Sequence, residues 1–245
     1  MTLVVLRHDV GTVANPAISV THLRQIVMLG RAFLVGHGEN LAPLSPGAPR
    51  ARLRRMLSTM QEVPFSVAQI LRYGAQTHGS TKCTTWRASG AEECTFADIG
   101  ARASAFANAL HDDLGIDGDQ RVATFMYNCA EHLEVMFAVA AKGAVFTPLN
   151  IQLMEDQIAY IVNHSEAKVI VADPRLAPKL GRLLQHCPLV ERVVFTGADP
   201  LAEVTADAAP MPEWVKLESY EMLLDGRSTV FPWPALPENT AAALV

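Results

Sequence analysis

Three ionisable side chains in a row have the residue types of a catalytic base with its orienting acid. His111 is followed directly by Asp112 and Asp113, and an imidazole held by a carboxylate is a common general base. All three fall at the polar end of a helical pattern, and charged side chains are rarely buried unless they are paired. We therefore expect a solvated helix terminus here rather than a catalytic site.

Three further histidines and one glutamate lie near the ends of predicted helices. His132 and Glu134 are close to the start of a predicted helix over 130–142, where a general base is conceivable. We expect instead that they cap the helix or face solvent. His164 and His186 each end a helical pattern, where a positive charge complements the helix dipole.

The cysteines are spaced too widely for a metal site or a disulfide framework. No C-x-x-C pair and no histidine at ligand spacing accompanies the four residues, which are Cys83, Cys94, Cys129 and Cys187. This usage is typical of reduced thiols in a cytoplasmic protein. Cys187 precedes a proline, and no nearby charge would lower its pKa.

Motifs that bind phosphates or activate a serine are absent from the sequence. It contains no G-x-x-x-x-G-K-[ST], no G-x-G-x-x-G and no G-x-S-x-G. The residues alone therefore predict no catalytic residue, no cofactor-binding residue and no metal ligand.

The composition is that of a folded chain with a large core. Of the 245 residues 50% are hydrophobic and 18% are charged, and the mean hydropathy is +0.17. These values exclude a disordered chain. No uncharged apolar run approaches the roughly 18–20 residues that a membrane-spanning helix needs, so we expect no transmembrane segment.

Strand-like and helical patterns alternate at a regular interval through the middle of the chain. The strand-like runs centre on Val122, Val145, Val169 and Val193, at spacings of 23, 24 and 24 residues. Helical patterns fill the gaps, over 130–142, 155–164 and 175–186. Such alternation is typical of βαβ units, so we predict an α/β fold whose mostly parallel sheet is layered with helices.

Shorter patterns before the repeating units predict a helix, a hairpin and a capped helix. Residues 65–78 have helical spacing, and two β-rich runs within 81–95 flank a loop that contains glycine. Thr95 has the character of an N-cap for a helix that ends near Gly115. We also expect the segment Asn128–Glu131 to cap the helix over 130–142.

The predicted elements continue beyond the repeating units. Gly143 is expected to end the helix over 130–142. A short strand near Val215 and a short helix over 220–224 are expected next. The apolar run Ala241–Val245 resembles the start of a buried strand.

Charge divides the chain into two unlike parts. Residues 1–55 carry a net charge of +5 from seven arginines, and the remainder carries −10. The first part has three interpretations: a nucleic-acid or membrane arm, an organelle transit peptide, or a poorly ordered leader that results from an upstream start site, with Met56 or Met60 as the later start. We favour the leader, because interleaved aromatic residues and serines are scarce there and the rest of the chain is acidic.

Six sequence strings, in order, resemble the fatty-acid–CoA ligases of the adenylate-forming enzymes. They are Thr95–Ile99, Gly118–Ala123, Asn128–Glu134, Lys142–Asn150, Gln157–Ile161 and His164–Ile170, and Asp173 follows them. The resemblance covers about Leu57 to Val245, so we expect residues 56–245 to be the front part of the family's N-terminal α/β domain, incomplete relative to the full domain.

The resemblance implies a ligase that uses ATP, Mg²⁺ and CoA. In the family, a Thr/Ser/Gly-rich phosphate loop ending in Lys follows a segment similar to Pro237–Leu244. A magnesium-binding acid, a ribose-binding aspartate and a C-terminal domain with a lysine come later. No position of this sequence matches these residues, so no site residue is carried over and we expect no ligand to be retained.

The resemblance leaves two interpretations of function. We expect a ligase fragment that is inactive alone. The alternative is a non-catalytic interaction module that is completed by, or dimerises with, another ligase chain. The expected partner is a complementing C-terminal ligase chain or another copy of this chain. Nucleic acid is not expected as a partner.

Overall fold

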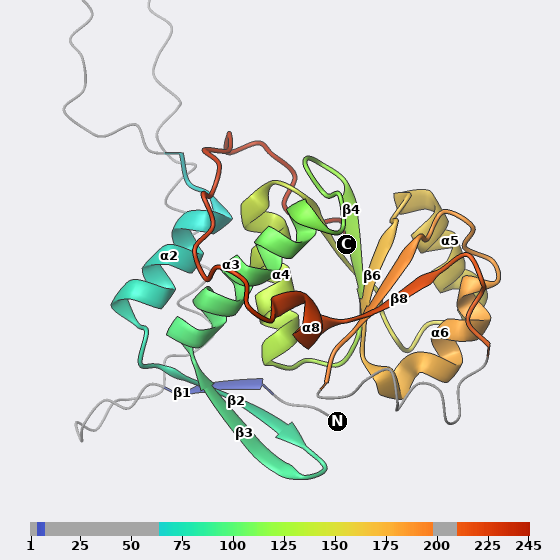
Figure 1. Ribbon diagram of the computed structural model, residues 1–245, viewed down its shortest axis with the longest axis horizontal. Helices are drawn as coiled ribbons and strands as arrows, with labels where there is room; N and C mark the ends of the chain where they lie inside the picture. The colour runs from blue at the N-terminus through green and yellow to red at the C-terminus, as the bar shows by residue number, and fades with distance from the viewer. Residues whose placement is uncertain (1–3, 8–63, 198–209) are drawn as a thin grey trace, which may run out of the picture. The chain divides into compact units, whose positions relative to one another are not determined.

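The computed structural model describes residues 4–7, 64–197 and 210–245 (Figure 1). Of the predicted leader over 1–55, it describes only strand β1 (Val4–Arg7), which pairs antiparallel with β2 (Lys82–Arg87). The rest of that leader lies outside the described residues, so its interpretation stays a prediction.

Five parallel strands form the central sheet, in the order β5-β4-β6-β7-β8. They are β4 (Arg121–Phe125), β5 (Val145–Pro148), β6 (Val169–Ala172), β7 (Arg192–Phe195) and β8 (Lys216–Ser219). The predicted α/β class and the four regularly spaced strands are confirmed. The expected strand near Val215 begins one residue later, as β8.

Helices cover both faces of this sheet, as the side chains of β6 show. Val169 and Val171 belong to one core cluster, together with residues of α3 (Phe96–Asp112) and α4 (Ala130–Lys142). Ile170 and Ala172 belong to the other cluster, with α5 (Glu155–Ser165) and α6 (Ala177–Leu184). Successive strand residues point to opposite faces, so a continuously apolar strand is the form expected when both faces are covered.

A second sheet contains the predicted hairpin. Strands β2 and β3 (Gly90–Thr95) pair antiparallel, and the short helix α2 (Val67–Thr77) precedes them. Thr95 caps α3 as expected: its Oγ1 accepts a hydrogen bond from the Asp98 amide at 3.2 Å, and Oδ2 of Asp98 accepts one from the Thr95 amide at 2.9 Å. This reciprocal capping box fixes the point where the hairpin becomes helix.

The predicted start and end of α4 are correct, but the acceptor of the capping hydrogen bond does not come from the segment Asn128–Glu131. Cys129 is the N-cap residue and its side chain makes no capping bond. The Ala130 amide instead donates to Oγ1 of Thr85 at 3.1 Å, so a residue of β2 satisfies the helix terminus. Gly143 ends the helix with φ at +97°, a conformation that favours glycine.

Two short helical elements follow strands of the parallel sheet. A 3₁₀ turn (η1, Pro174–Leu176) follows β6, and helix α8 (Tyr220–Leu224) follows β8 where a short helix was predicted. The prediction that residues 241–245 begin a buried strand is wrong, because most of them are exposed. Ala243 forms a parallel bridge with Phe146 of β5, but it and the two residues after it are exposed, because no described element covers them.

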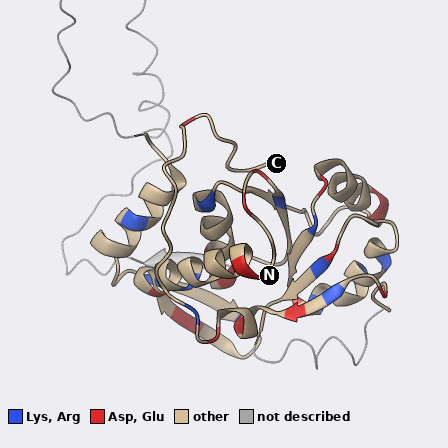
Figure 2. Cartoon of the chain, turned by 45° about the horizontal axis from the view of Figure 1, so that its top comes forward, with Lys and Arg blue, Asp and Glu red and all other residues tan. Residues whose placement is uncertain are grey.

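Within the described ranges, every helix is too short or too polar to cross a membrane. Acidic and basic residues are interspersed over the helices and strands (Figure 2).

Candidate functional site

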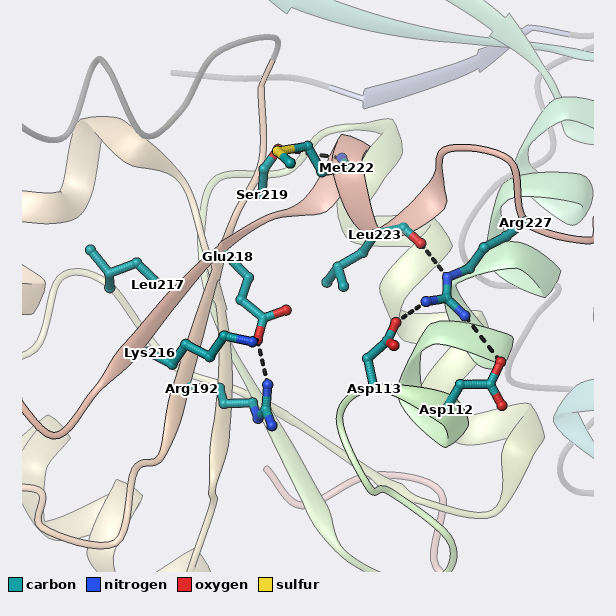
Figure 3. Close-up of a pocket in the computed structure, with 10 residues that line it drawn as sticks. All are labelled: Asp112, Asp113, Arg192, Lys216, Leu217, Glu218, Ser219, Met222, Leu223 and Arg227. Carbon is teal, nitrogen blue, oxygen red and sulfur yellow. Dashed lines mark hydrogen bonds and ion pairs between the residues drawn. The ribbon is translucent and has the colours of Figure 1, made fainter.

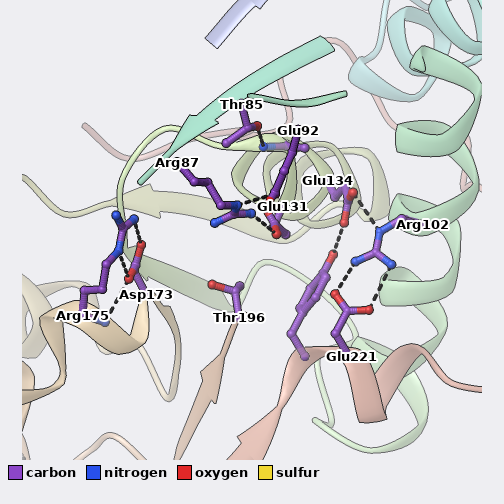
Figure 4. A network of polar contacts seen from close by, with 12 residues as sticks. Thr85, Arg87, Glu92, Arg102, Glu131, Glu134, Asp173, Arg175, Thr196 and Glu221 are labelled. Carbon is purple, nitrogen blue, oxygen red and sulfur yellow. Dashed lines mark hydrogen bonds and ion pairs between the residues drawn. The ribbon is translucent and has the colours of Figure 1, made fainter. Parts of the chain in front are cut away.

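A cavity of about 640 Å³ opens at the carboxyl ends of β6 and β7, beside the tip of the β2–β3 hairpin. Ligands of open parallel sheets usually bind outside the carboxyl ends of the strands, so this cavity is the first candidate. Its charged lining residues come from five elements or their flanking loops, and are Arg87, Glu92, Glu131, Asp173, Arg175 and Glu221 (Figure 4).

Asp173 and Arg175 form a compact pair directly after β6. Oδ1 of the buried Asp173 accepts from the Arg175 amide at 2.9 Å and from its Nε at 2.8 Å. The guanidinium carbon of Arg175 lies 4.7 Å from the ring centroid of Tyr127, a cation–π contact. The hydrogen bond to Asp173 raises the pKa of Arg175, so its positive charge is fixed at the mouth of the cavity.

Arg87 brings the hairpin to the start of α4. Its Nη2 donates to Oε1 of Glu131 at 2.6 Å, and its Nε contacts Glu92 on the neighbouring strand. Both acids therefore pair with the same guanidinium. The ion pair between Arg87 and Glu131 joins the antiparallel sheet to α4, whose N-terminus faces the cavity.

A buried ionic network extends from this cavity toward α3. Oε1 of Glu134 accepts from Nε of Arg102 at 2.9 Å, and Oε2 accepts from the hydroxyl of Tyr220 at 2.9 Å. Arg102 also donates to both carboxylate oxygens of Glu221, at 3.1 and 2.6 Å. Figure 4 shows Glu134, Arg102 and Glu221 meeting between α3, α4 and α8.

Glu134 corrects the sequence-based expectation, because it is neither a capping residue nor solvent-exposed. Only 2% of the residue is accessible. Burial raises the pKa of Glu134 to about 7, even though the charge of Arg102 and the bond from Tyr220 act in the opposite direction. A group with this pKa could transfer protons near neutrality, but both of its oxygens are already bound inside the fold.

His132 was also expected to cap the helix or face solvent, and it does neither. Its Nε2 lies 2.9 Å from Oγ1 of Thr124 on β4, and its ring centroid is 5.6 Å from that of Phe146 on β5. Burial lowers the pKa of His132 to about 4, so the ring is neutral at physiological pH. This is a partly buried histidine whose ring contacts a threonine.

The remaining histidines lie where they were expected. His111 is exposed and contacts Asp117, while Asp112 and Asp113 both pair with Arg227. Figure 3 shows Asp112, Asp113 and Arg227 at the rim of a second cavity of about 570 Å³, beside β8. His164 and His186 are exposed near the ends of α5 and α6.

The cysteines and the possible metal ligands can be located in the part of the chain that the structure describes. All four cysteines are free thiols, and burial raises the pKa of Cys187 to about 11. Among the described residues, no group of three or more His, Cys, Asp or Glu side chains could hold a metal ion.

A sequence model of the family described as "AMP-binding enzyme" matches residues 71–241, which include all five strands of the parallel sheet and the site above. The chain belongs to the AMP-binding enzyme family.

Relatives within this family are CoA ligases. The chain is 30% identical to a 3-methylmercaptopropionyl-CoA ligase of Ruegeria pomeroyi, over 77% of the chain and 34% of that protein. It is 29% identical to a medium-chain-fatty-acid–CoA ligase of Ectopseudomonas oleovorans, over 77% of the chain and 33% of that protein. The chain therefore spans about a third of the length of the curated relatives it matches.

A solved structure supports the same fold. The crystal structure of the anthranilate CoA ligase AuaEII in complex with anthranoyl-AMP superposes with a TM-score of 0.60 at 16% identity, over 75% of this chain and 32% of that one. For this member of the AMP-binding enzyme family, the predicted resemblance is confirmed at the level of family and fold.

The sequence could not indicate the network of Glu134, because its partners lie far away in the chain. Arg102 is 32 residues earlier and Tyr220 is 86 residues later. One signal was available: Glu134 stands between apolar residues of α4 on the face that points to the core. A charged residue at such a position is buried only with a partner.

Proposed function

We propose that this chain is part of a fatty-acid–CoA ligase. The complete enzyme would activate a fatty acid with ATP to an acyl-adenylate, and CoA would then displace AMP. Two observations support this: the family match over residues 71–241, and relatives that are CoA ligases for 3-methylmercaptopropionate and for medium-chain fatty acids.

We further propose that the chain alone catalyses neither step. The observation that carries this proposal is the internal pairing of the candidate site. Each carboxylate that lines the cavity at the carboxyl ends of β6 and β7 is bound to an arginine. The pairs are Asp173 with Arg175, Glu131 and Glu92 with Arg87, and Glu221 with Arg102. A carboxylate paired in this way is a poor base, because the neighbouring cation favours its ionised form.

The described residues do not fit the magnesium ion that the reaction would require. They contain no candidate cluster of metal ligands, and the sequence has no glycine-rich phosphate loop of the P-loop type. We therefore propose that ATP and magnesium are bound by the other two thirds of the enzyme, supplied by a complementing ligase chain.

ATP–pyrophosphate exchange tests this proposal. The chain alone, incubated with ATP, Mg²⁺ and fatty acids of several lengths, should give exchange at the background rate. The Ectopseudomonas oleovorans ligase serves as the positive control. Co-expression with the portion of that ligase that this chain does not cover should raise exchange above the sum of the separate parts. Exchange by the chain alone would overturn the proposed inactivity.

An interaction module is the second candidate, and exposed apolar side chains on and beside α2 favour it. Phe65 is 69% exposed, Tyr73 is 61% exposed and Ile70 is 44% exposed. Apolar side chains gathered on one surface commonly mark a protein–protein contact. Sedimentation velocity over a range of concentrations tests this function: Tyr73→Glu should weaken self-association, whereas Tyr160→Glu on α5, equally exposed, should not.

A further inference from the structure

Two cysteines face each other across the β2–β3 hairpin. The register places Cys83 directly opposite Cys94, in a ladder that runs unbroken from Lys82–Thr95 to Arg87–Gly90. Directly opposed residues of antiparallel strands have Cα atoms about 4.5–5.5 Å apart and side chains on the same face. That separation lies within the range of about 4.4–6.8 Å found in disulfides. The two thiols also share a hydrogen bond.

The surroundings give the two thiols different access to solvent. Cys83 is 1% exposed and belongs to the core beneath the hairpin. Cys94 is half-buried and lines a cavity of about 250 Å³. A small oxidant that enters this cavity therefore meets Cys94 first, and Cys83 lies next to it as a second thiol.

The other two cysteines are not opposite Cys83 in the hairpin register, although Cys129 belongs to the same core cluster as Cys83. Cys187 belongs to the core cluster on the opposite face of the parallel sheet. The thiol of Cys129 is bonded to Glu131 at the start of α4.

We propose that Cys83 and Cys94 form a redox pair that peroxide converts to a disulfide, which cross-links the two strands of the hairpin. The Cys94 thiolate attacks one oxygen of hydrogen peroxide, the O–O bond breaks, and the hydroxide released takes up the Cys94 proton as water. The sulfur of Cys83 then attacks the resulting sulfenic acid. The S–S bond forms as the S–O bond breaks, and the leaving hydroxide takes up the Cys83 proton. The two sulfurs lose two electrons and the peroxide becomes two waters.

Burial sets the rate of this reaction. It raises the pKa of the Cys83 thiol, and it raises the pKa of Cys94 to about 12. Because the thiolate is the nucleophile, oxidation is slow at neutral pH and becomes about tenfold faster with each pH unit between pH 7 and 9. The product is a slowly formed cross-link at the base of the hairpin, directly before the Thr95 cap of α3.

Tryptic mapping of the full chain tests the proposal. The reduced chain is treated with hydrogen peroxide, remaining thiols are blocked with N-ethylmaleimide, and the chain is then denatured and digested. Cleavage after Lys82, Arg87 and Arg102 places Cys83 and Cys94 in separate peptides, 83–87 and 88–102. The expected product is these two peptides joined by a disulfide, from chains that run as monomers on a non-reducing gel.

Variants and a denatured control separate this pairing from random oxidation. Cys187→Ala should keep the linked peptide, and Cys94→Ala should abolish it. In urea, the wild-type chain should distribute its disulfides over all four cysteines. Recovery of Cys83 only as the maleimide adduct, its linkage to Cys129 or Cys187, or disulfide-bonded dimers would overturn the proposal. An oxidation rate that does not change between pH 7 and 9 would also overturn it.

Discussion

The hydroxyl of Tyr220 donates a 2.9 Å hydrogen bond to Oε2 of Glu134, a residue 86 positions earlier in the chain. Both side chains are buried, and the other carboxylate oxygen of Glu134 accepts from Arg102. The bond joins α8 to α4 inside the fold. It is one of the contacts that hold the segment after β7 against the helices that precede it.

Removal of the Tyr220 hydroxyl should destabilise the chain measurably. Tyr220→Phe leaves Oε2 of Glu134 buried without a donor, and an unsatisfied buried acceptor costs about 1–3 kcal/mol. Urea unfolding followed by circular dichroism measures this loss in the free energy of unfolding. Tyr160→Phe on the exposed face of α5 is the matched control, with an expected change within about 0.5 kcal/mol. Equal losses in the two variants would contradict a role for the buried bond.

Glu134 should make stability fall as the pH rises from about 4.5 to 7. Its folded pKa of about 7 exceeds the ordinary value of 4.5 for a glutamate, so the folded chain binds the proton more tightly than the unfolded chain. Its contribution is complete below pH 4.5 and is lost as the pH rises through 7, with a slope of at most about 1.4 kcal/mol per pH unit. Glu134→Gln should remove this slope from a series of urea unfolding curves. An unchanged pH profile would show that the carboxyl does not titrate in this range.

His132 should give a slope of the opposite sign over an overlapping range. Its folded pKa of about 4 lies below the ordinary value of 6.5 for a histidine, so the unfolded chain binds the proton more tightly. Stability from this group is complete above pH 6.5 and is lost as the pH falls through 4. His132→Gln should therefore flatten the loss of stability on the acid side. The same urea series should show the two variants changing the profile in opposite directions between pH 4.5 and 6.5.

The cross-element cap of α4 should resemble an ordinary N-cap in strength. Thr85→Val keeps the shape of the side chain but removes the oxygen that accepts from the Ala130 amide, so we expect a loss of about 0.5–2 kcal/mol in the free energy of unfolding. Thr84→Val on the neighbouring position of β2 is a matched control, since it is also buried. A larger loss at Thr84 than at Thr85 would contradict the capping role.

Gly143 should tolerate a side chain less well than another glycine with positive φ. An added Cβ at Gly143 would lie 3.0 Å from Cδ2 of Leu236, whereas one at Gly226 would meet nothing within 4 Å. Backbone strain alone costs about 1–2 kcal/mol at either position. Thermal unfolding should therefore give a lower Tm for Gly143→Ala than for Gly226→Ala. Equal values would show that Leu236 moves aside freely.

The repeating part of the fold was predictable because its signals are local. Apolar runs such as the one around Val169, the Thr95 cap and the Gly143 terminus each depend on residues within one turn or one strand. The alternation of these local signals identifies a parallel sheet, because a strand followed by a helix and a strand has few other ways to pack. The order of the strands in the sheet depends on which strands pair with each other, and no single segment of the sequence indicates that.

The chemical environment of the site could not be predicted in the same way. The sequence predicts that His132 and Glu134 cap the helix or face solvent, because it shows only that they lie near the start of a helix. Their burial depends on Thr124, Phe146 and Tyr220, which come from three other elements. A residue's place along one helix does not indicate which distant strand or helix will cover it.

The bridge between Ala243 and Phe146 has a consequence for synthesis of the chain. Strand β5 emerges from the ribosome roughly 100 residues before the segment that pairs with its outer edge. At about 5–20 residues per second, that edge waits for about 5–20 s with unpaired backbone groups. During this interval nascent chains on neighbouring ribosomes could pair with it, so β5 is the strand that a chaperone would most need to shield.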